Sequence, residues 1–203
     1  PNLTPLMLLN AYAVGYFPMG DPETGEVHWY SPDPRGHLPL DDFRTSASLH
    51  KTVRRRVFAI RADTAFEQVM RACALPRPNQ PDTWINEPII AAYTELHRRG
   101  WAHSVEAWRD GQLVGGLYGV SIHGAFFGES MFSLPAQGGT DASKVCLVAL
   151  VEHLRARGYS LLDTQFVNPH LEQFGCAAIR RDEYMKRLER ALEQSDVNWG
   201  EWS

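Results

Sequence analysis

The chain has 203 residues, a formal net charge of −4 and 44% hydrophobic residues, which suits one large domain or one domain with a small appendage. It has no run of about 18 apolar residues and no charged-then-apolar start, so neither a membrane span nor a secretory signal is expected. The mild negative charge argues against a surface built throughout for nucleic acid. Three widely spaced cysteines among apolar residues predict buried thiols in a reducing cytoplasm and no metal site.

Residues 1–35 are predicted to form a small N-terminal domain, with a short helix over 6–14 followed by a turn-rich stretch. Residues 36–203 are predicted to form a second, larger domain of mixed helix and strand. Its first elements are a strand at 57–61 and a helix that a capping box at Thr64 and Glu67 would start.

After a proline-rich loop, Asn86 is expected to cap the next helix. A meander of three strands follows, with turns at Asp110-Gly111 and His123-Gly124. A long helix comes next, which the Asp141 side chain is expected to cap and Gly158 to end. The predicted elements after it are a strand over 160–167, a helical turn over 170–174, a short strand over 177–179 and a last helix that opens at Asp182. This order predicts an α+β fold with one mixed sheet, and it matches the acetyltransferase-like (GNAT) fold.

Three polar residues lie inside apolar, strand-like segments: Glu129, Asp163 and Gln165. Burying a carboxylate is costly without partners, so such residues are paired for structure or held for chemistry. Alternation along a strand would place Asp163 and Gln165 on one face, with Cα atoms roughly 6.5–7 Å apart. A carboxylate beside an amide suits acyl transfer to an amine, although Asp163 could instead only bond a nearby backbone N–H.

Other chemistries lack their patterns. The sequence has no serine in a nucleophile elbow, no histidine spacing typical of a metal site and no phosphate-binding glycine loop. His28, His37 and His123 lie in predicted turns and are expected at the surface, whereas His103 lies in a strand and is expected to have a structural partner. A basic cluster that includes Arg54, Arg55 and Arg56 is either a solvated face or a phosphate contact surface.

Eight ordered motifs resemble the leucyl/phenylalanyl-tRNA–protein transferase family, over residues from about 6 to about 190. They are Tyr16-Phe17-Pro18, Trp29-Tyr30-Ser31-Pro32-Asp33-Pro34-Arg35, Thr83-Trp84-Ile85, His103-Ser104-Val105-Glu106, Val114-Gly115-Gly116-Leu117-Tyr118-Gly119-Val120, Gly128-Glu129-Ser130-Met131-Phe132-Ser133, Ala142-Ser143-Lys144 and Leu162-Asp163-Thr164-Gln165.

The resemblance implies a bacterial cytoplasmic enzyme that moves leucine or phenylalanine from aminoacyl-tRNA to the N-terminal arginine or lysine of a protein, which marks that protein for N-end-rule degradation. It also implies a small N-terminal domain on a GNAT-like catalytic domain, with no metal and no acetyl-CoA.

By the same resemblance, Asp163 and Gln165 would bind the attacking amine, with Glu129 in the same site. Trp84 and Met19 would hold the 3′-terminal adenosine of the tRNA, and the Met19 position often carries tryptophan in the family. The transferred side chain would lie against Leu117, Phe126, Leu147, Leu150 and Leu154. The tRNA backbone would contact the basic cluster.

The sequence leaves two alternative functions open. One is a GNAT-type N-acetyltransferase that uses acetyl-CoA, although Gly139-Thr140-Asp141-Ala142-Ser143-Lys144 lacks the basic, glycine-rich pattern of such enzymes. The other is a non-catalytic tRNA-binding module.

Overall fold

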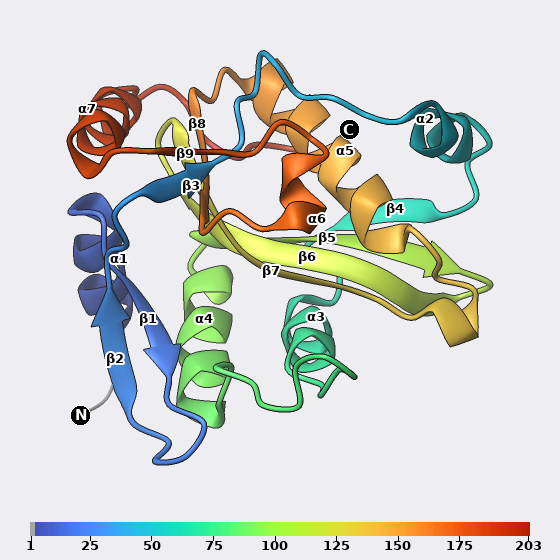
Figure 1. Cartoon of the computed structure of the whole chain (residues 1–203), viewed down its shortest axis with the longest axis horizontal. Helices are drawn as coiled ribbons and strands as arrows, with labels where there is room; N and C mark the ends of the chain where they lie inside the picture. Colours follow the sequence, from blue (N-terminus) through green and yellow to red (C-terminus); the bar gives the residue numbers. More distant parts are fainter. Residues whose placement is uncertain (1–2) are drawn as a thin grey trace.

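The computed structural model describes residues 3–203 and, within them, builds a seven-stranded sheet and a two-stranded sheet (Figure 1). The strand order of the large sheet is β4-β5-β6-β7-β8-β3-β9. Strands β7 and β8 pair in parallel, whereas the other described pairs are antiparallel. The predicted α+β class with one mixed sheet is therefore confirmed.

The first part of the chain holds helix α1 (Pro5–Ala13) and the hairpin of β1 (Phe17–Gly20) and β2 (Val27–Tyr30). Strand β3 (Arg35–His37) then enters the large sheet between β8 and β9. Helix α1 shares a hydrophobic cluster with later elements, so the domain boundary at residue 35 stays a prediction. Residues 1 and 2 of that predicted domain lie outside the described range.

The predicted meander is confirmed, and its strands form the centre of the large sheet. Both turns have residues with positive φ, at Asp110 and His123, as tight hairpins require. The strands of the sheet besides β3 are β4 (Ala59–Ala62), β5 (Ala102–Arg109), β6 (Gln112–Ile122), β7 (Ala125–Ser133), β8 (Leu161–Gln165) and β9 (Ala177–Ile179).

Helices cover the central strands on both faces (Figure 1). Two core clusters result: one lies toward α1, α3, α4 and α7, and the other toward α2 and α5. The bounds of the helices besides α1 are α2 (Ala47–Arg54), α3 (Phe66–Cys73), α4 (Glu87–Arg98), the 3-10 turn η1 (Pro135–Gln137), α5 (Ala142–Arg157), α6 (Pro169–Glu172) and α7 (Arg181–Leu192).

Two predicted helix caps are wrong, and in both cases a neighbouring strand supplies the acceptor. At the start of α3 the Glu106 carboxylate of β5 accepts from the backbone N–H groups of Thr64 at 3.0 Å and Ala65 at 3.1 Å. At the start of α5 the Ser133 hydroxyl of β7 accepts from the Ser143 N–H at 2.9 Å. By contrast, the predicted cap of α4 by Asn86 is confirmed, since its side chain accepts from Ile89 N–H.

Replacing Glu106 with glutamine is expected to lower the free energy of unfolding by about 1.5–3 kcal/mol, because fully buried Glu106 also accepts from Ser104 and Trp108. Chemical denaturation would measure this loss. The matched control is Glu67→Gln. It changes the carboxylate of the capping box that the structure rejects, and the contact it weakens is an exposed ion pair with Arg71. An effect of the control as large as that of Glu106→Gln would contradict this assignment of the cap.

Other expectations about buried residues have mixed outcomes. All three cysteines are buried and free, as expected. His103 is bonded to Asp63 at 2.8 Å, which confirms its structural role. The surface position expected for His37 is wrong, because His37 lies in β3 and pairs across from Asp163. Within residues 3–203 no helix is long and apolar enough to cross a membrane.

Candidate active site

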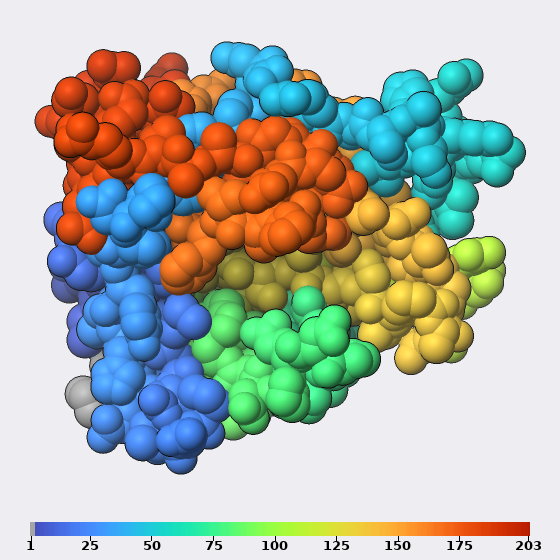
Figure 2. Space-filling view, viewed as in Figure 1, coloured from blue at the N-terminus to red at the C-terminus, as the bar shows by residue number. Residues whose placement is uncertain are grey.

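A pocket of about 470 Å³ opens where β6, β7 and β8 meet α5, α6 and the loop before α4. Figure 2 shows it as a hollow between the orange segment that carries α6 and the green segment that leads into α4. The floor of the pocket is formed by β6 and β7, which pair antiparallel, and by β8, which pairs in parallel with β7. Residues far apart in sequence therefore line the same pocket.

One side of the pocket is an apolar wall. It is made by leucine side chains from a strand of the meander, from α5 and from β8: Leu117, Leu147, Leu150 and Leu162. Phe126 and Leu154 do not line the pocket; both are fully buried in the core behind it, and Phe126 stacks on Trp199.

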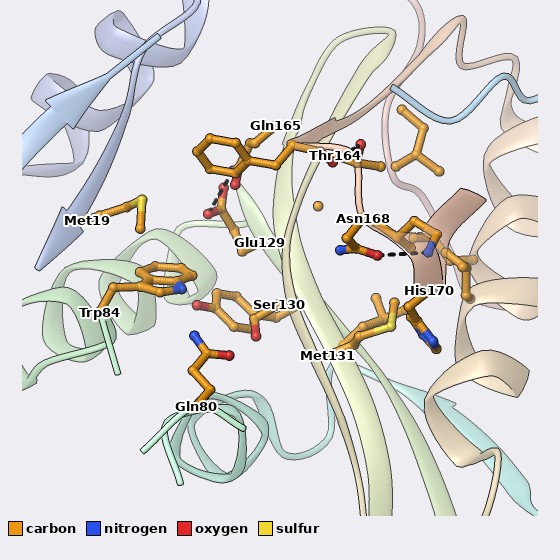
Figure 3. Close-up of a pocket in the computed structure, with 18 of the residues that line it drawn as sticks. Met19, Gln80, Trp84, Glu129, Ser130, Met131, Thr164, Gln165, Asn168 and His170 are labelled. Atoms are coloured by element: carbon orange, nitrogen blue, oxygen red, sulfur yellow. Dashed lines mark hydrogen bonds between the residues drawn. The ribbon is translucent and has the colours of Figure 1, made fainter. Parts of the chain in front are cut away.

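The opposite edge is polar and centres on Glu129 of β7. Glu129 Oε1 accepts from the Tyr12 hydroxyl at 2.5 Å, and Glu129 Oε2 accepts from Gln165 Nε2 at 3.1 Å. Tyr12 in turn contacts the hydroxyl of Tyr93. In Figure 3 Glu129 and Gln165 point toward each other across the edge of the pocket. Both carboxylate oxygens of Glu129 are thus held from different elements.

Burial raises the pKa of Glu129 from 4.5 to about 7, against the lowering effect of the hydrogen bonds from Tyr12 and Gln165. Glu129 therefore exchanges a proton in the neutral range, where a carboxyl group is normally always ionised. A pocket carboxyl with such a pKa is a candidate general acid–base group.

Asp163 lies behind the pocket and not in its lining. It is fully buried, and its oxygens accept two parallel hydrogen bonds from Arg35, at 3.0 Å from Nε and 2.8 Å from Nη2. Its Oδ1 also accepts from the backbone N–H of Gln165 at 2.9 Å. The expected alternation of side chains ends at Gln165, whose φ of 68° turns its amide into the pocket.

Close backbone approach beside β8 depends on Gly36 of β3. A Cβ atom at this position would lie 2.5 Å from the backbone carbonyl group of Phe166, so only glycine fits without a shift of the chain. Gly36 therefore lets Arg35 approach Asp163 from the neighbouring strand.

Met19 and Trp84 lie together at the mouth of the pocket (Figure 3). Their segments are joined by a hydrogen bond from Gly20 N–H to the Trp84 carbonyl at 2.9 Å. Arg77, whose guanidinium donates to the Met131 carbonyl at 2.5 Å, brings a positive charge to the same lining.

The basic cluster lies elsewhere. Arg54, Arg55 and Arg56 are exposed at the end of α2 and have no ion pair among the described residues. Figure 2 shows the α2 segment in cyan at the upper right of the face on which the hollow opens. In the same described range no group of three or more potential ligand side chains could hold a metal ion.

Several residues of the site had no role predicted from the sequence. Tyr12 and Tyr93 fall on apolar helix faces, where an aromatic residue is usually core. Arg35 stood in a recognised motif without an assigned contact. Tyr118 lines the pocket, and its hydroxyl has no hydrogen-bond partner within residues 3–203. No local pattern marks these residues: the partners of Tyr12, Tyr93 and Arg35 lie more than 80 positions away, and Tyr118 has none in the described part of the chain.

Family models for the two parts of "Leucyl/phenylalanyl-tRNA protein transferase" match residues 1–33 and 37–189. The chain belongs to this family. A leucyl/phenylalanyl-tRNA–protein transferase of Salinibacter ruber is 52% identical over 198 residues, which are 98% of this chain and 84% of the relative. One of Herpetosiphon aurantiacus is 53% identical over 96% of this chain and 97% of the relative. The resemblance seen in the motifs is thus confirmed over nearly the whole chain.

The solved structures that the chain is similar to are more distant. A ribosomal-protein-alanine N-acetyltransferase of Brucella melitensis is 19% identical with a TM-score of 0.39, over 57% of this chain and 87% of the other. L-PGS of Bacillus licheniformis is 11% identical with a TM-score of 0.43, over 88% of this chain and 60% of the other. The family assignment rests on the sequence matches alone.

Proposed function

We propose that this chain is a cytoplasmic enzyme that transfers leucine or phenylalanine from aminoacyl-tRNA to the N-terminal arginine or lysine of a protein, which marks the protein for N-end-rule degradation. The observation that carries the proposal, given the family, is the pocket: a wall of leucines faces a carboxyl group with a pKa of about 7. No cofactor or metal is part of the proposal.

The apolar wall fits the side chain that is transferred. Leu117, Leu147 and Leu150 offer aliphatic surface to a leucyl or phenylalanyl group and no polar partner to a hydrophilic one. The choice of amino acid then rests on the hydrophobic effect, at about 25 cal/mol per Å² buried. Phe126 and Leu154 would support this wall from the core.

The polar edge fits the acceptor. The aminoacyl ester is already activated, so the enzyme mainly supplies positioning and proton transfer. In this proposal Glu129 accepts a proton from the attacking amine, Gln165 holds Glu129 and the nucleophile, and Asp163 fixes the backbone of Gln165; the hydrogen bonds from Gln165 to Glu129 and to Asp163 support these roles. A carboxylate also favours a cationic N-terminal residue.

The mouth of the pocket fits the end of a tRNA. Trp84 offers an aromatic face for the terminal adenine, and stacking of a base on such a face contributes about 1–3 kcal/mol. Met19 offers a thioether contact beside it. Arg77 at the mouth and the basic cluster farther away would neutralise phosphates.

Removing the charges of the basic cluster is expected to weaken tRNA binding and to flatten its salt dependence. Each lost phosphate contact lowers the magnitude of the slope of log K against log[salt] by about 0.7–0.9. Filter binding of charged tRNA to an Arg54→Gln/Arg55→Gln variant at several salt concentrations measures both effects. The matched control is Arg98→Gln, which removes a surface charge that is already paired with Glu95. An unchanged slope would show that the cluster is only a solvated face.

The central test is transfer itself. The protein is incubated with labelled Leu-tRNA or Phe-tRNA and with a peptide that begins with arginine. Label is expected on this peptide and not on the same peptide with an acetylated N-terminus. Absence of label at every salt concentration, in protein shown to be folded, would overturn the proposal. Transfer of an acetyl group from acetyl-CoA would instead support the acetyltransferase alternative.

A further inference from the structure

Two fully buried tyrosine hydroxyls are linked in series to the pocket carboxylate. The Tyr12 hydroxyl of α1 donates to Glu129 Oε1 at 2.5 Å, and the Tyr12 and Tyr93 hydroxyls contact each other. A phenol has one proton to donate, and Tyr12 uses it on Glu129. Tyr93 must therefore donate to Tyr12. The result is a directed chain from α4 through α1 to β7.

The aromatic rings of this chain are fixed by packing. Tyr12 lies against Phe127 with ring centroids 4.8 Å apart, and Tyr93 meets Tyr118 edge-on at 6.1 Å. Gln165 holds the second oxygen of Glu129. A carboxylate offers about four lone-pair sites, so Glu129 keeps acceptor capacity for a group in the pocket while its orientation is set from behind.

We propose that Tyr12 and Tyr93 are positioning residues for peptide-bond formation, which hold Glu129 as an oriented carboxylate so that it accepts the proton of the attacking amine. This inference rests on the proposed transferase function. Helix α1 thereby contributes directly to the catalytic machinery of the sheet.

The reaction step balances around Glu129. The uncharged amine nitrogen attacks the ester carbonyl carbon, an N–C bond forms, and a proton on that nitrogen passes to the Glu129 carboxylate. When the tetrahedral species collapses, the C–O bond to the ribose breaks. The Glu129 carboxyl group then gives its proton to the departing ribose oxygen, which regenerates the carboxylate.

The charge state of Glu129 reflects every element packed around it. Burial raises its pKa, the Asp163 carboxylate adds to this rise, and the Tyr12 and Gln165 hydrogen bonds and the Arg35 charge lower it. The uncharged phenols that also face it are those of Tyr93 on α4, Tyr118 on β6 and Tyr184 on α7. Loss of the Tyr12 hydroxyl removes one of the effects that favour the carboxylate, so the pKa of Glu129 rises.

The test compares Tyr12→Phe and Tyr93→Phe, which keep the rings and remove single hydroxyls. In Tyr12→Phe the acid limb of the profile of kcat/KM against pH is expected to move up by about 1 pH unit, which is roughly tenfold in rate on that limb. Tyr93→Phe acts through Tyr12, so its shift is expected in the same direction and smaller. The matched control is Tyr159→Phe, a buried tyrosine whose hydroxyl bonds Ser121 at 2.5 Å outside the pocket; it is expected to shift nothing.

A second readout needs no substrate. Infrared titration of the carboxyl band, taken as the difference from Glu129→Gln, follows the protonation of Glu129 in the free protein. The band is expected to titrate at higher pH in Tyr12→Phe. An unmoved band with an unmoved acid limb overturns the inference. A moved band in a protein whose wild type transfers no amino acid overturns the proposed function instead. If Tyr12→Phe does not fold, the same two readouts on Tyr93→Phe decide the inference.

Discussion

Replacing Glu129 with glutamine is expected to lower kcat/KM for aminoacyl transfer by roughly 10²- to 10⁴-fold, the usual contribution of a general acid–base group. Glutamine keeps the shape of the side chain but cannot take up a proton, and its Nε2 replaces one of the two oxygens that accept from Tyr12 and Gln165. Single-turnover transfer from labelled Leu-tRNA measures the loss. The matched control is Glu193→Gln, an exposed acid outside the pocket lining, which is expected to leave the rate unchanged.

Although Glu129→Gln lowers activity, it is expected to reduce the loss of stability that the wild type undergoes as the pH rises. The folded-state pKa of Glu129 is raised from 4.5 to about 7. Its contribution to stability is therefore fully present below about pH 4.5 and is lost as the pH rises through 7. Glu129→Gln has no such loss, so its free energy of unfolding should fall less than that of the wild type between pH 5 and pH 8. Denaturation at both pH values checks this; parallel changes in the two proteins would contradict a raised pKa for the half-buried Glu129 carboxyl group.

Breaking the buried pair of Arg35 and Asp163 is the second large effect. Arg35→Met is expected to cost about 3–5 kcal/mol of stability, because it leaves a fully buried carboxylate without its counter-charge. For a chain of this size the melting temperature should fall by roughly 6–20 °C. Calorimetry measures the loss, with Arg98→Met as the control, since Arg98 forms an exposed pair with Glu95 worth at most about 1 kcal/mol.

A double substitution separates pairing from packing. Arg35→Met with Asp163→Leu removes both charges, so the uncompensated charge disappears and part of the stability should return. The double variant also loses the hydrogen bond from Arg35 to the Gly15 carbonyl, at 2.7 Å, and the one from Gln165 N–H, so the return is not complete. A double variant that is less stable than Arg35→Met alone would show that the pair is not the source of the effect.

Local patterns predicted much of the fold because their causes are local. Asn86 caps α4 through a backbone N–H only three residues away, and Asp110-Gly111 turns the chain within a hairpin. At the two wrong caps, a strand side chain supplied the acceptor in place of the predicted capping side chain. At the start of α3, the acceptor is the Glu106 carboxylate, 42 positions from Thr64. At the start of α5, the acceptor is the Ser133 hydroxyl. Strand β3 was missed because three residues are too few to show a period.

The predicted positions of the candidate-site residues were also partly right and partly wrong. Of the residues that the family resemblance named for the site, Glu129, Gln165, Trp84, Met19, Leu117, Leu147 and Leu150 line the pocket, whereas Phe126, Leu154 and Asp163 do not. Asp163 was expected to face the same side as Gln165. The structure instead turns Asp163 toward Arg35, because β3 inserts beside β8 and because the backbone of Gln165 adopts a positive φ. What each of these residues does to a substrate stays a prediction.

The sequence by itself determined the fold class, the family and part of the pocket lining, including Glu129 and Gln165, since ordered motifs and periodic patterns are written along the chain. Only the tertiary structure decided how those residues are held. Tyr12 reaches Glu129 across 117 positions and Arg35 reaches Asp163 across 128, so no local pattern contains either contact. The physical reason is burial: it makes an unpaired carboxylate costly, and its partners come from whichever elements the packed core brings near.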